Sequence, residues 1–180
     1  MALQKKWLVF YTKSRSEKKA LEQLRKFGYE GYLPLHKVVR QWSDRKKKVE
    51  VPLFNSYIFV YEHESRIPEV LQAIPTIAWN IRHNGKPAIL RERELETIKR
   101  FIATGLTIES SHIDDIRKGD KVEVTDGPLK GMVGLLKGDY NEEKFSVAVR
   151  TIDQVLTVNI NKSVLRKIDE GENIEEGFWN

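Results

Sequence analysis

The segment Val51–Tyr61, VPLFNSYIFVY, constrains the fold more than any other part of this chain. Successive side chains of a β-strand point to opposite faces of the sheet, so both faces of a strand beginning at Tyr57 would be apolar or aromatic. The two faces would carry Tyr57, Phe59 and Tyr61 on one side and Ile58 and Val60 on the other. We predict that the aliphatic face packs beneath helices. The aromatic face is either core or a surface that receives a partner.

Residues 1–105 alternate between strand-type and helix-type apolar patterns. A Ser-x-x-Glu capping-box spacing at residues 14–17 precedes apolar residues at helical spacing, and Gly28 suits the end of that helix. Asn84-Gly85 predicts a hairpin turn. We expect strands at 5–13, 29–42, 49–54, 57–61 and 76–90, and helices at 17–27, 66–74 and 91–105. These patterns predict an α+β sandwich with helices on a mostly antiparallel sheet.

The pattern of the remaining residues predicts a second, all-β domain. Residues 106–115 are polar, lack helical periodicity and are expected to form a linker. Residues 116–168 contain short alternating strands separated by glycine-containing turns, which is typical of a small SH3-like five-stranded barrel. Their β-branched residues and internal glycines favour a permanent barrel over a helical alternative. Residues 169–180 are acidic and expected to be disordered.

The charge of the chain is distributed unevenly. Residues 1–105 carry 21 Lys and Arg against 11 Asp and Glu, whereas residues 106–180 carry 10 against 15. A strongly basic half-chain suits a nucleic-acid partner, although a solvated lysine-rich face is an equally simple explanation of the charge alone.

Several classes of function lack support in the sequence. No apolar run approaches the roughly 18 residues of a membrane span, and no signal-peptide pattern is present, so a cytoplasmic protein is expected. The chain has no Cys, and its four His lack metal-ligand spacing. No phosphate-binding loop or nucleophile motif occurs. We therefore expect a protein that is not an enzyme and has no metal or cofactor, and a monomer is the default.

Two motifs together indicate a family. The pattern G-D-x-V-x-V-x-D-G-P-L-x-G-x-x-G, residues 119–134, resembles the KOW motif of NusG-type transcription elongation factors. WLVFYTK (7–13), EKK (17–19), YLP (32–34) and VPLFNSYIFV (51–60) resemble the NusG N-terminal domain in order and spacing. The KOW turn positions are Gly119, Asp126, Gly127, Pro128, Gly131 and Gly134.

One departure from the family pattern points to a subgroup. Housekeeping members have Phe-Pro-Gly-Tyr where this chain has Phe54-Asn55-Ser56-Tyr57. Residues 41–54 are more similar to specialised paralogues, RfaH and the UpxY-type antiterminators. The missing Pro-Gly leaves the geometry of this turn open.

The resemblance implies three kinds of contact. Aromatic residues at Tyr11, Phe54, Tyr57 and Phe59 would hold the β′ clamp helices of RNA polymerase, and the domain would bridge towards the β lobe. The non-template DNA strand would meet basic and stacking side chains. These nucleic-acid candidates are Lys13, Arg15, Lys19, Gln23, Arg40, Trp42, Arg45 and Lys46. The KOW part would recruit a further partner, such as the ribosome or a termination factor.

This resemblance implies a transcription elongation or antitermination factor that suppresses pausing or termination. A ribosome-associated or RNA-binding KOW protein without a polymerase role is the alternative, and it places RNA affinity in residues 116–168. An enzyme is the third hypothesis and would require a bound metal or cofactor.

Overall fold

The computed structural model describes residues 4–115, 119–139 and 142–169, and the chain forms two compact units. One unit contains residues 1–35 and 52–92, and the other contains residues 36–51 and 93–180. The division differs from the expected boundary at residue 105, because the segment 36–51 and the helix after residue 92 group with the C-terminal residues. Each unit is described by itself.

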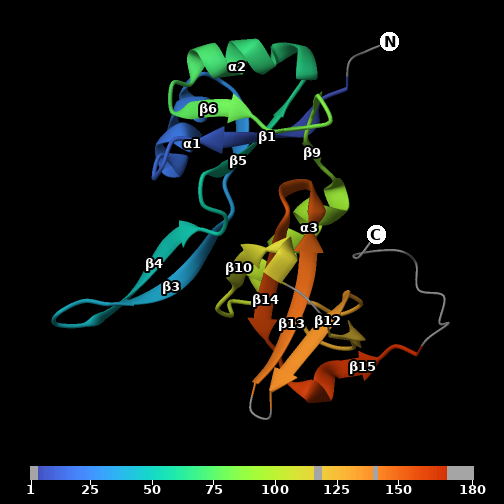
Figure 1. The fold of residues 1–180 in the computed structure, drawn as a ribbon. Coiled ribbons are helices and arrows are strands. Elements are labelled where there is room, and N and C mark those ends of the chain that lie inside the picture. The colour runs from blue at the N-terminus through green and yellow to red at the C-terminus, as the bar shows by residue number, and fades with distance from the viewer. Residues whose placement is uncertain (1–3, 116–118, 140–141, 170–180) are drawn as a thin grey trace. The chain divides into compact units, whose positions relative to one another are not determined.

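The first unit is built on a five-stranded antiparallel sheet with the order β2-β5-β1-β6, in which β9 also pairs with β1. Its strands are β1 (Lys6–Thr12), β2 (Glu30–Tyr32), β5 (Tyr57–Glu62), β6 (Ile77–Asn80) and β9 (Ile89–Leu90). Its helices are α1 (Glu17–Lys26), α2 (Ile67–Ala73) and the 3-10 turn η1 (Glu64–Arg66). Figure 1 shows α1 and α2 close to these strands.

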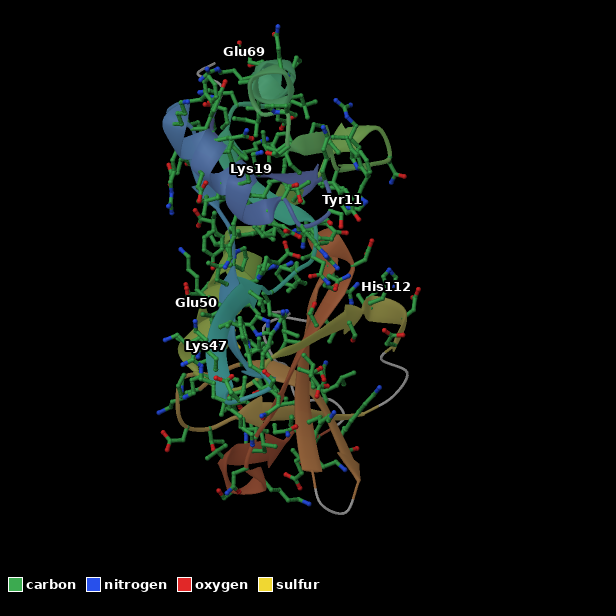
Figure 2. All side chains as sticks on the ribbon, turned by 90° about the vertical axis from the view of Figure 1, so that its left-hand side faces the viewer. Tyr11, Lys19, Lys47, Glu50, Glu69 and His112 are labelled. Carbon is green, nitrogen blue, oxygen red and sulfur yellow. The ribbon has the colours of Figure 1, made fainter. Side chains whose placement is uncertain are left out.

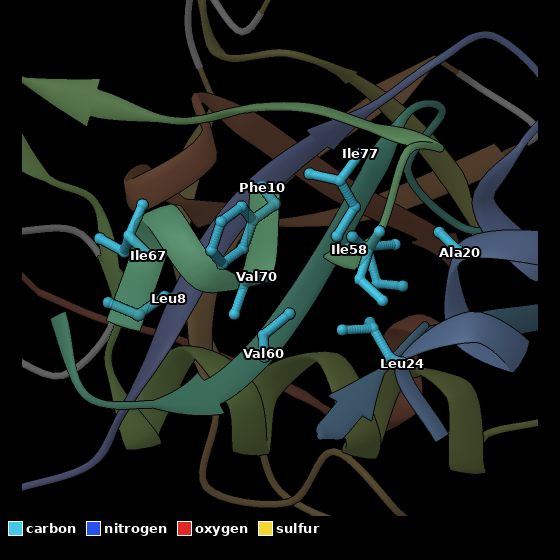
Figure 3. Packing of buried hydrophobic residues seen from close by; sticks show 10 residues of the cluster. Leu8, Phe10, Ala20, Leu24, Ile58, Val60, Ile67, Val70 and Ile77 are labelled. Atoms are coloured by element: carbon cyan, nitrogen blue, oxygen red, sulfur yellow. The ribbon is translucent and has the colours of Figure 1, made fainter. Parts of the chain in front are cut away.

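The core of this unit lies between the sheet and its two α-helices (Figure 3). Alternate residues of β1 and β5 enter it, and α1 and α2 cover them with residues at helical spacing. The buried cluster consists of Leu8, Phe10, Ala20, Leu24, Ile58, Val60, Ile67, Val70, Ile74 and Ile77. The prediction that Ile58 and Val60 are core is confirmed.

The expected hairpin turn is also confirmed. Two short strands, β7 (Arg82–His83) and β8 (Lys86–Pro87), pair on either side of Asn84 and Gly85. Both turn residues have positive φ, 50° for Asn84 and 78° for Gly85, as the tight hairpin turn requires.

The predicted capping box at residues 14–17 is wrong. The N-cap of α1 is Ser16, whose side chain makes no cap hydrogen bond and instead donates to the carbonyl of Ser14. Glu17 does not reach back to the helix start, because its carboxylate accepts a hydrogen bond from the backbone amide of Ser56. A tertiary contact has replaced the local one.

Residues 36–51 form most of a two-stranded ribbon made of β3 (Leu35–Gln41) and β4 (Lys46–Pro52). Its turn is closed by a hydrogen bond from the Trp42 amide to the Arg45 carbonyl. Most side chains along the ribbon are exposed.

The second unit also contains a six-stranded antiparallel sheet, in the order β10-β14-β13-β12-β11-β15. The strands are β10 (Glu109–His112), β11 (Asp120–Val124), β12 (Val133–Asp139), β13 (Glu142–Val149), β14 (Gln154–Asn159) and β15 (Leu165–Lys167). Three 3-10 turns accompany them, η2 (Ile113–Asp115), η3 (Arg150–Ile152) and η4 (Lys162–Val164). Five of these strands match the predicted ones.

The sixth strand, β10, corrects both the expected strand number and the expected linker. It lies within residues 106–115 and pairs with β14, from Glu109 opposite Thr157 to His112 opposite Gln154. The polar segment joins the sheet because backbone pairing needs no apolar side chain. The acidic residues 170–180 lie outside the described residues.

Helix α3 (Glu92–Ala103) packs on this sheet through aromatic and polar contacts. The ring of Phe101 stacks on that of Phe145 in β13, with centroids 6.3 Å apart. Glu94 accepts hydrogen bonds from the Thr151 amide (2.9 Å) and hydroxyl (2.6 Å). These contacts explain why the helix groups with the C-terminal residues.

Two glycines within residues 119–134 occupy positions where a side chain would be unfavourable. Gly131 has a φ of 79°, which an L side chain rarely adopts. Gly134 in β12 approaches its neighbours so closely that a Cβ would lie 2.6 Å from the carbonyl oxygen of Ser146. In the described part of the chain, no helix is long and apolar enough to cross a membrane.

Candidate interaction surfaces

Aromatic side chains cover the face of the first unit's sheet that is opposite to the α1/α2 core. The register places Trp7 opposite Tyr61, Val9 opposite Phe59 and Tyr11 opposite Tyr57 on neighbouring strands, and Trp79 opposite Tyr11 on the other side of β1. We call the following residues the aromatic face: Trp7, Tyr11, Tyr32, Tyr57, Phe59, Tyr61 and Trp79.

The rings of the aromatic face contact one another in two groups. At one end, Tyr11 meets Tyr57 edge to face with centroids 5.6 Å apart, and it stacks on Trp79 at 4.7 Å with an interplanar angle of 11°. At the other end, Trp7 contacts Tyr32 and Tyr61 with centroids 6.1 and 5.2 Å away. Such pairs hold the rings in fixed orientations, as a preorganised binding surface requires.

The four predicted clamp-binding residues differ in exposure. Tyr11 and Tyr57 are half-buried, whereas Phe54 is 2% exposed and Phe59 is completely buried in this structure. Trp79 is 52% exposed, so it offers the largest accessible ring beside Tyr11. The sequence interpretation missed Trp79, because only the β1–β6 pairing brings it to Tyr11.

The turn between Phe54 and Tyr57 has an unusual backbone. Ser56 has a φ of 64°, in the left-handed region where the housekeeping family pattern has Gly. Its amide donates to the Glu17 carboxylate at 2.8 Å, and its carbonyl accepts from the Thr12 amide at 2.8 Å. Thus the turn adopts the glycine-type geometry without glycine.

Some ionisable groups near the sheet have shifted pKa values. Burial raises the pKa of the Tyr32 hydroxyl to about 12. Burial alone would raise the pKa of Glu62, but the hydrogen bond from the His63 amide and the charges of Arg66 and Lys5 outweigh it, so this pKa lies below its ordinary value. Tyr32 therefore stays neutral and Glu62 ionised near neutral pH.

The first group of predicted nucleic-acid residues lies at the start of α1. Lys13, Arg15 and Lys19 are exposed, and the side chain of Lys19 projects from α1 (Figure 2). Gln23 is half-buried and its Oε1 accepts a hydrogen bond from the Thr76 hydroxyl at 2.5 Å. The three cations can meet phosphates, while the amide group of Gln23 is held in one orientation.

The second group lies on the β3–β4 ribbon, in the other unit. Arg40, Trp42, Arg45 and Lys46 are all exposed there. Residues 36–51 contain six Lys and Arg against two Asp and Glu. Trp42 is 52% exposed, and the Lys47 Nζ lies 5.9 Å from its ring centroid. A stacking ring beside cations is the combination that single-stranded nucleic acids bind.

In the second unit's sheet, the predicted turn residues have structural contacts. Arg100 of α3 donates to the carbonyls of Pro128 and Lys130. Four basic side chains, three on strands and Lys162 on η4, pair with acidic ones: Lys144–Glu109, Lys162–Glu143, Arg166–Glu123 and Lys167–Asp120. Local pairing lowers the positive potential that this sheet presents to phosphates.

No group of three or more His, Cys, Asp or Glu gathers as a metal site among the described residues.

Comparison with known proteins identifies the family. The family model described as "NusG: Transcription termination factor nusG" matches residues 5–99, which is more than half of the chain. This chain belongs to the NusG family of transcription factors, whose members are not enzymes.

Solved structures provide a comparison of the fold. The chain matches NusG from Thermotoga maritima, solved in a study of its domain interaction, with a TM-score of 0.56 and 24% identity. That match covers 94% of this chain and all of the other. A chain of the MjSpt4:Spt5 complex in conformation B matches at 15% identity over 93% of this chain and 99% of the other, with a TM-score of 0.30.

Proposed function

We propose that this protein is an elongation and antitermination factor that binds the β′ clamp helices of RNA polymerase through its aromatic face. Membership of the NusG family supports a role in transcription. The observation that carries the proposal is the preorganised cluster of Tyr11, Tyr57 and Trp79, because rigid, partly exposed aromatic rings are typical anchors for a helical partner.

Binding would act by differential stabilisation. A factor that contacts the clamp on one side and the β lobe on the other favours the closed, active polymerase over the paused one. It therefore suppresses pausing or termination without chemistry of its own. Phe54 and Phe59 are buried here, so Tyr11, Tyr57 and Trp79 would supply the accessible area of the surface.

The basic groups would contact DNA. Lys13, Arg15 and Lys19 at the start of α1 are the proposed contacts to the non-template strand, with Gln23 as the residue that can discriminate between bases. The residues Arg40, Trp42, Arg45 and Lys46 of the ribbon would add phosphate contacts and stacking. The KOW sheet would recruit a further protein, such as the ribosome or a termination factor.

Asn55 and Ser56 in place of Pro-Gly support a specialised, RfaH- or UpxY-like member rather than a housekeeping one. The alternative proposal, a ribosome-associated or RNA-binding KOW protein, finds less support because four basic residues on and beside the second unit's sheet are paired with acidic neighbours.

The test is co-elution of the full chain with core RNA polymerase in gel filtration. The proposal requires that the wild-type protein co-elutes and that the double variant Tyr11→Ala/Tyr57→Ala does so much more weakly. Lys162→Ala, an exposed change on the other unit, is the control and should behave as wild type. If wild-type protein remains separate from polymerase but binds RNA, the alternative replaces this proposal.

A further inference from the structure

We propose that Glu17 is a positioning residue for the polymerase-binding surface: its buried carboxylate holds the 54–57 turn in the one conformation that presents Tyr57. This inference rests on the proposed function and names a residue that makes no contact with the partner itself. Three observations support it, from the backbone, from hydrogen bonding and from the place of Glu17 in the chain.

The backbone conformation of the turn is energetically unfavourable unless other contacts stabilise it. The φ of 64° at Ser56 belongs to the left-handed region, which an L residue occupies with a population about tenfold lower than its ordinary conformations. Ser56 follows Phe54 and Asn55 and directly precedes Tyr57, the first residue of β5. A change of φ at Ser56 would therefore redirect the chain immediately before an aromatic residue of the proposed surface.

Two hydrogen bonds hold Ser56 in this conformation. Its amide donates to Glu17 Oε1 at 2.8 Å, and its carbonyl accepts from the amide of Thr12, the last residue of β1, at 2.8 Å. The bond to Thr12 extends the pairing of β1 with β5, in which Tyr11 lies opposite Tyr57. The bond to Glu17 is the one that comes from outside the sheet, and it is charge-assisted and buried.

Helix α1 fixes the position of Glu17 relative to the turn. It is the first residue of α1 and only 7% exposed, and Ala20 and Leu24 anchor the same helix in the core. The carboxylate is therefore aimed at the turn by a packed helix. Without it, the Ser56 amide would lose a buried acceptor and the turn could relax to more favourable dihedral angles.

Loss of the Glu17 hydrogen bond should weaken polymerase binding, because a smaller fraction of the molecules would hold the 54–57 turn in the conformation that binds. If Glu17→Ala frees Ser56 to leave the left-handed region, the binding-competent fraction falls and the apparent affinity for core RNA polymerase should weaken about tenfold. Glu17→Gln retains an acceptor oxygen and should remain within about threefold of wild type. Ser56→Gly adopts a positive φ without strain, so it should restore the affinity of Glu17→Ala to within about threefold.

The experiment measures polymerase affinity by fluorescence titration of full-length protein for wild type, Glu17→Ala, Glu17→Gln, Ser56→Gly and the double variant Glu17→Ala/Ser56→Gly. Glu22→Ala, an exposed glutamate of the same helix, is the matched control. Circular dichroism melts report whether each variant is folded at the assay temperature. If Glu17→Ala alone does not fold, the comparison of the double variant with Glu17→Gln and Ser56→Gly still tests the proposal.

Rescue by Ser56→Gly supports positioning where the melts show both Glu17→Ala and the double variant folded at the assay temperature, because the difference in affinity then does not come from unfolded protein. A folded Glu17→Ala that binds polymerase as tightly as wild type overturns the inference and leaves the proposed function intact. An unrescued loss in the double variant also overturns it. If wild-type protein itself does not bind, the proposed function fails, and this inference fails with it.

Discussion

The rings of Tyr11 and Trp79 stack across neighbouring strands, with centroids 4.7 Å apart and planes 11° from parallel. The two residues are separated by most of the first unit's sequence, yet the β1–β6 register places them directly opposite each other. Because Trp79 remains 52% exposed, this pair joins the inner part of the aromatic face to its accessible edge.

Trp79→Ala should therefore weaken binding to core RNA polymerase by about 10- to 100-fold, the range expected for loss of a tryptophan hot spot. Trp42→Ala removes a ring of the same 52% exposure from the ribbon and is the matched control for the polymerase contact. Titration of core polymerase without nucleic acid measures both. Equal affinities of wild type and Trp79→Ala would contradict the prediction.

Ser56→Gly should raise the free energy of unfolding by about 0.5–1 kcal/mol, because relief of the left-handed conformation outweighs the extra freedom of glycine in the unfolded chain. Ser56→Ala retains the strained φ and should not stabilise the protein. Urea unfolding of the two variants and wild type measures the difference. A destabilised Ser56→Gly would show that the Ser56 side chain matters more than its backbone.

Acid should remove the stabilisation that Glu62 provides. The folded-state pKa of Glu62 is lowered below the ordinary 4.5, so its contribution is complete above about pH 4.5 and is lost as the pH falls through the lowered pKa. Glu62→Gln should cost about 1–2 kcal/mol at pH 7, and its deficit should shrink below about pH 4.5.

Urea unfolding across this pH range tests the effect at Glu62. Glu69→Gln is the control, because Glu69 also pairs with Arg66 but its side chain is 59% exposed. A deficit of Glu62→Gln that does not change with pH would disprove the linkage.

Gly134→Ala should destabilise the second unit by about 1–3 kcal/mol through overpacking. A Cβ at this position would lie 2.5 Å from the Phe145 ring and 2.6 Å from the Ser146 carbonyl oxygen, and backbone atoms cannot move aside cheaply. The comparison is Gly28→Ala, where the added Cβ meets open space and only the positive φ of 77° is unfavourable. Thermal unfolding should show the larger loss for Gly134→Ala, and the reverse order would contradict this account.

The ribbon should contribute to the salt dependence of nucleic-acid binding. Replacing both Arg45 and Lys46 by Gln should reduce the slope of log affinity against log salt for single-stranded DNA by about 1.4, that is, about 0.7 for each phosphate contact. Gln replacements of Arg166 and Lys167, which pair with Glu123 and Asp120, are the control and should leave the slope unchanged. Fluorescence anisotropy at several salt concentrations measures it.

Local sequence patterns were sufficient for several parts of the fold. The alternation after Tyr57 predicted that Ile58 and Val60 are core, because strand geometry assigns faces by residue parity alone. Asn84-Gly85 predicted its hairpin because few other residues accept the two positive φ values. The strands after residue 118 followed from alternation and glycine-containing turns.

Other features depended on contacts between distant residues. Glu17 fits a capping box by spacing, but a backbone amide 39 residues away competes for its carboxylate and the buried tertiary bond forms. Residues 109–112 carry no strand pattern, yet they form a strand by pairing with the edge of β14. Trp79 becomes part of the aromatic face only through its register with Tyr11.

The sequence by itself thus determined the periodic elements, the family resemblance and the residue types of the candidate surfaces, because dihedral preferences and strand parity act over a few residues. Only the tertiary structure decided which rings are accessible, which carboxylate holds the Ser56 turn and which unit includes α3. Those outcomes depend on competition among packing partners far apart along the chain, and no local pattern records it.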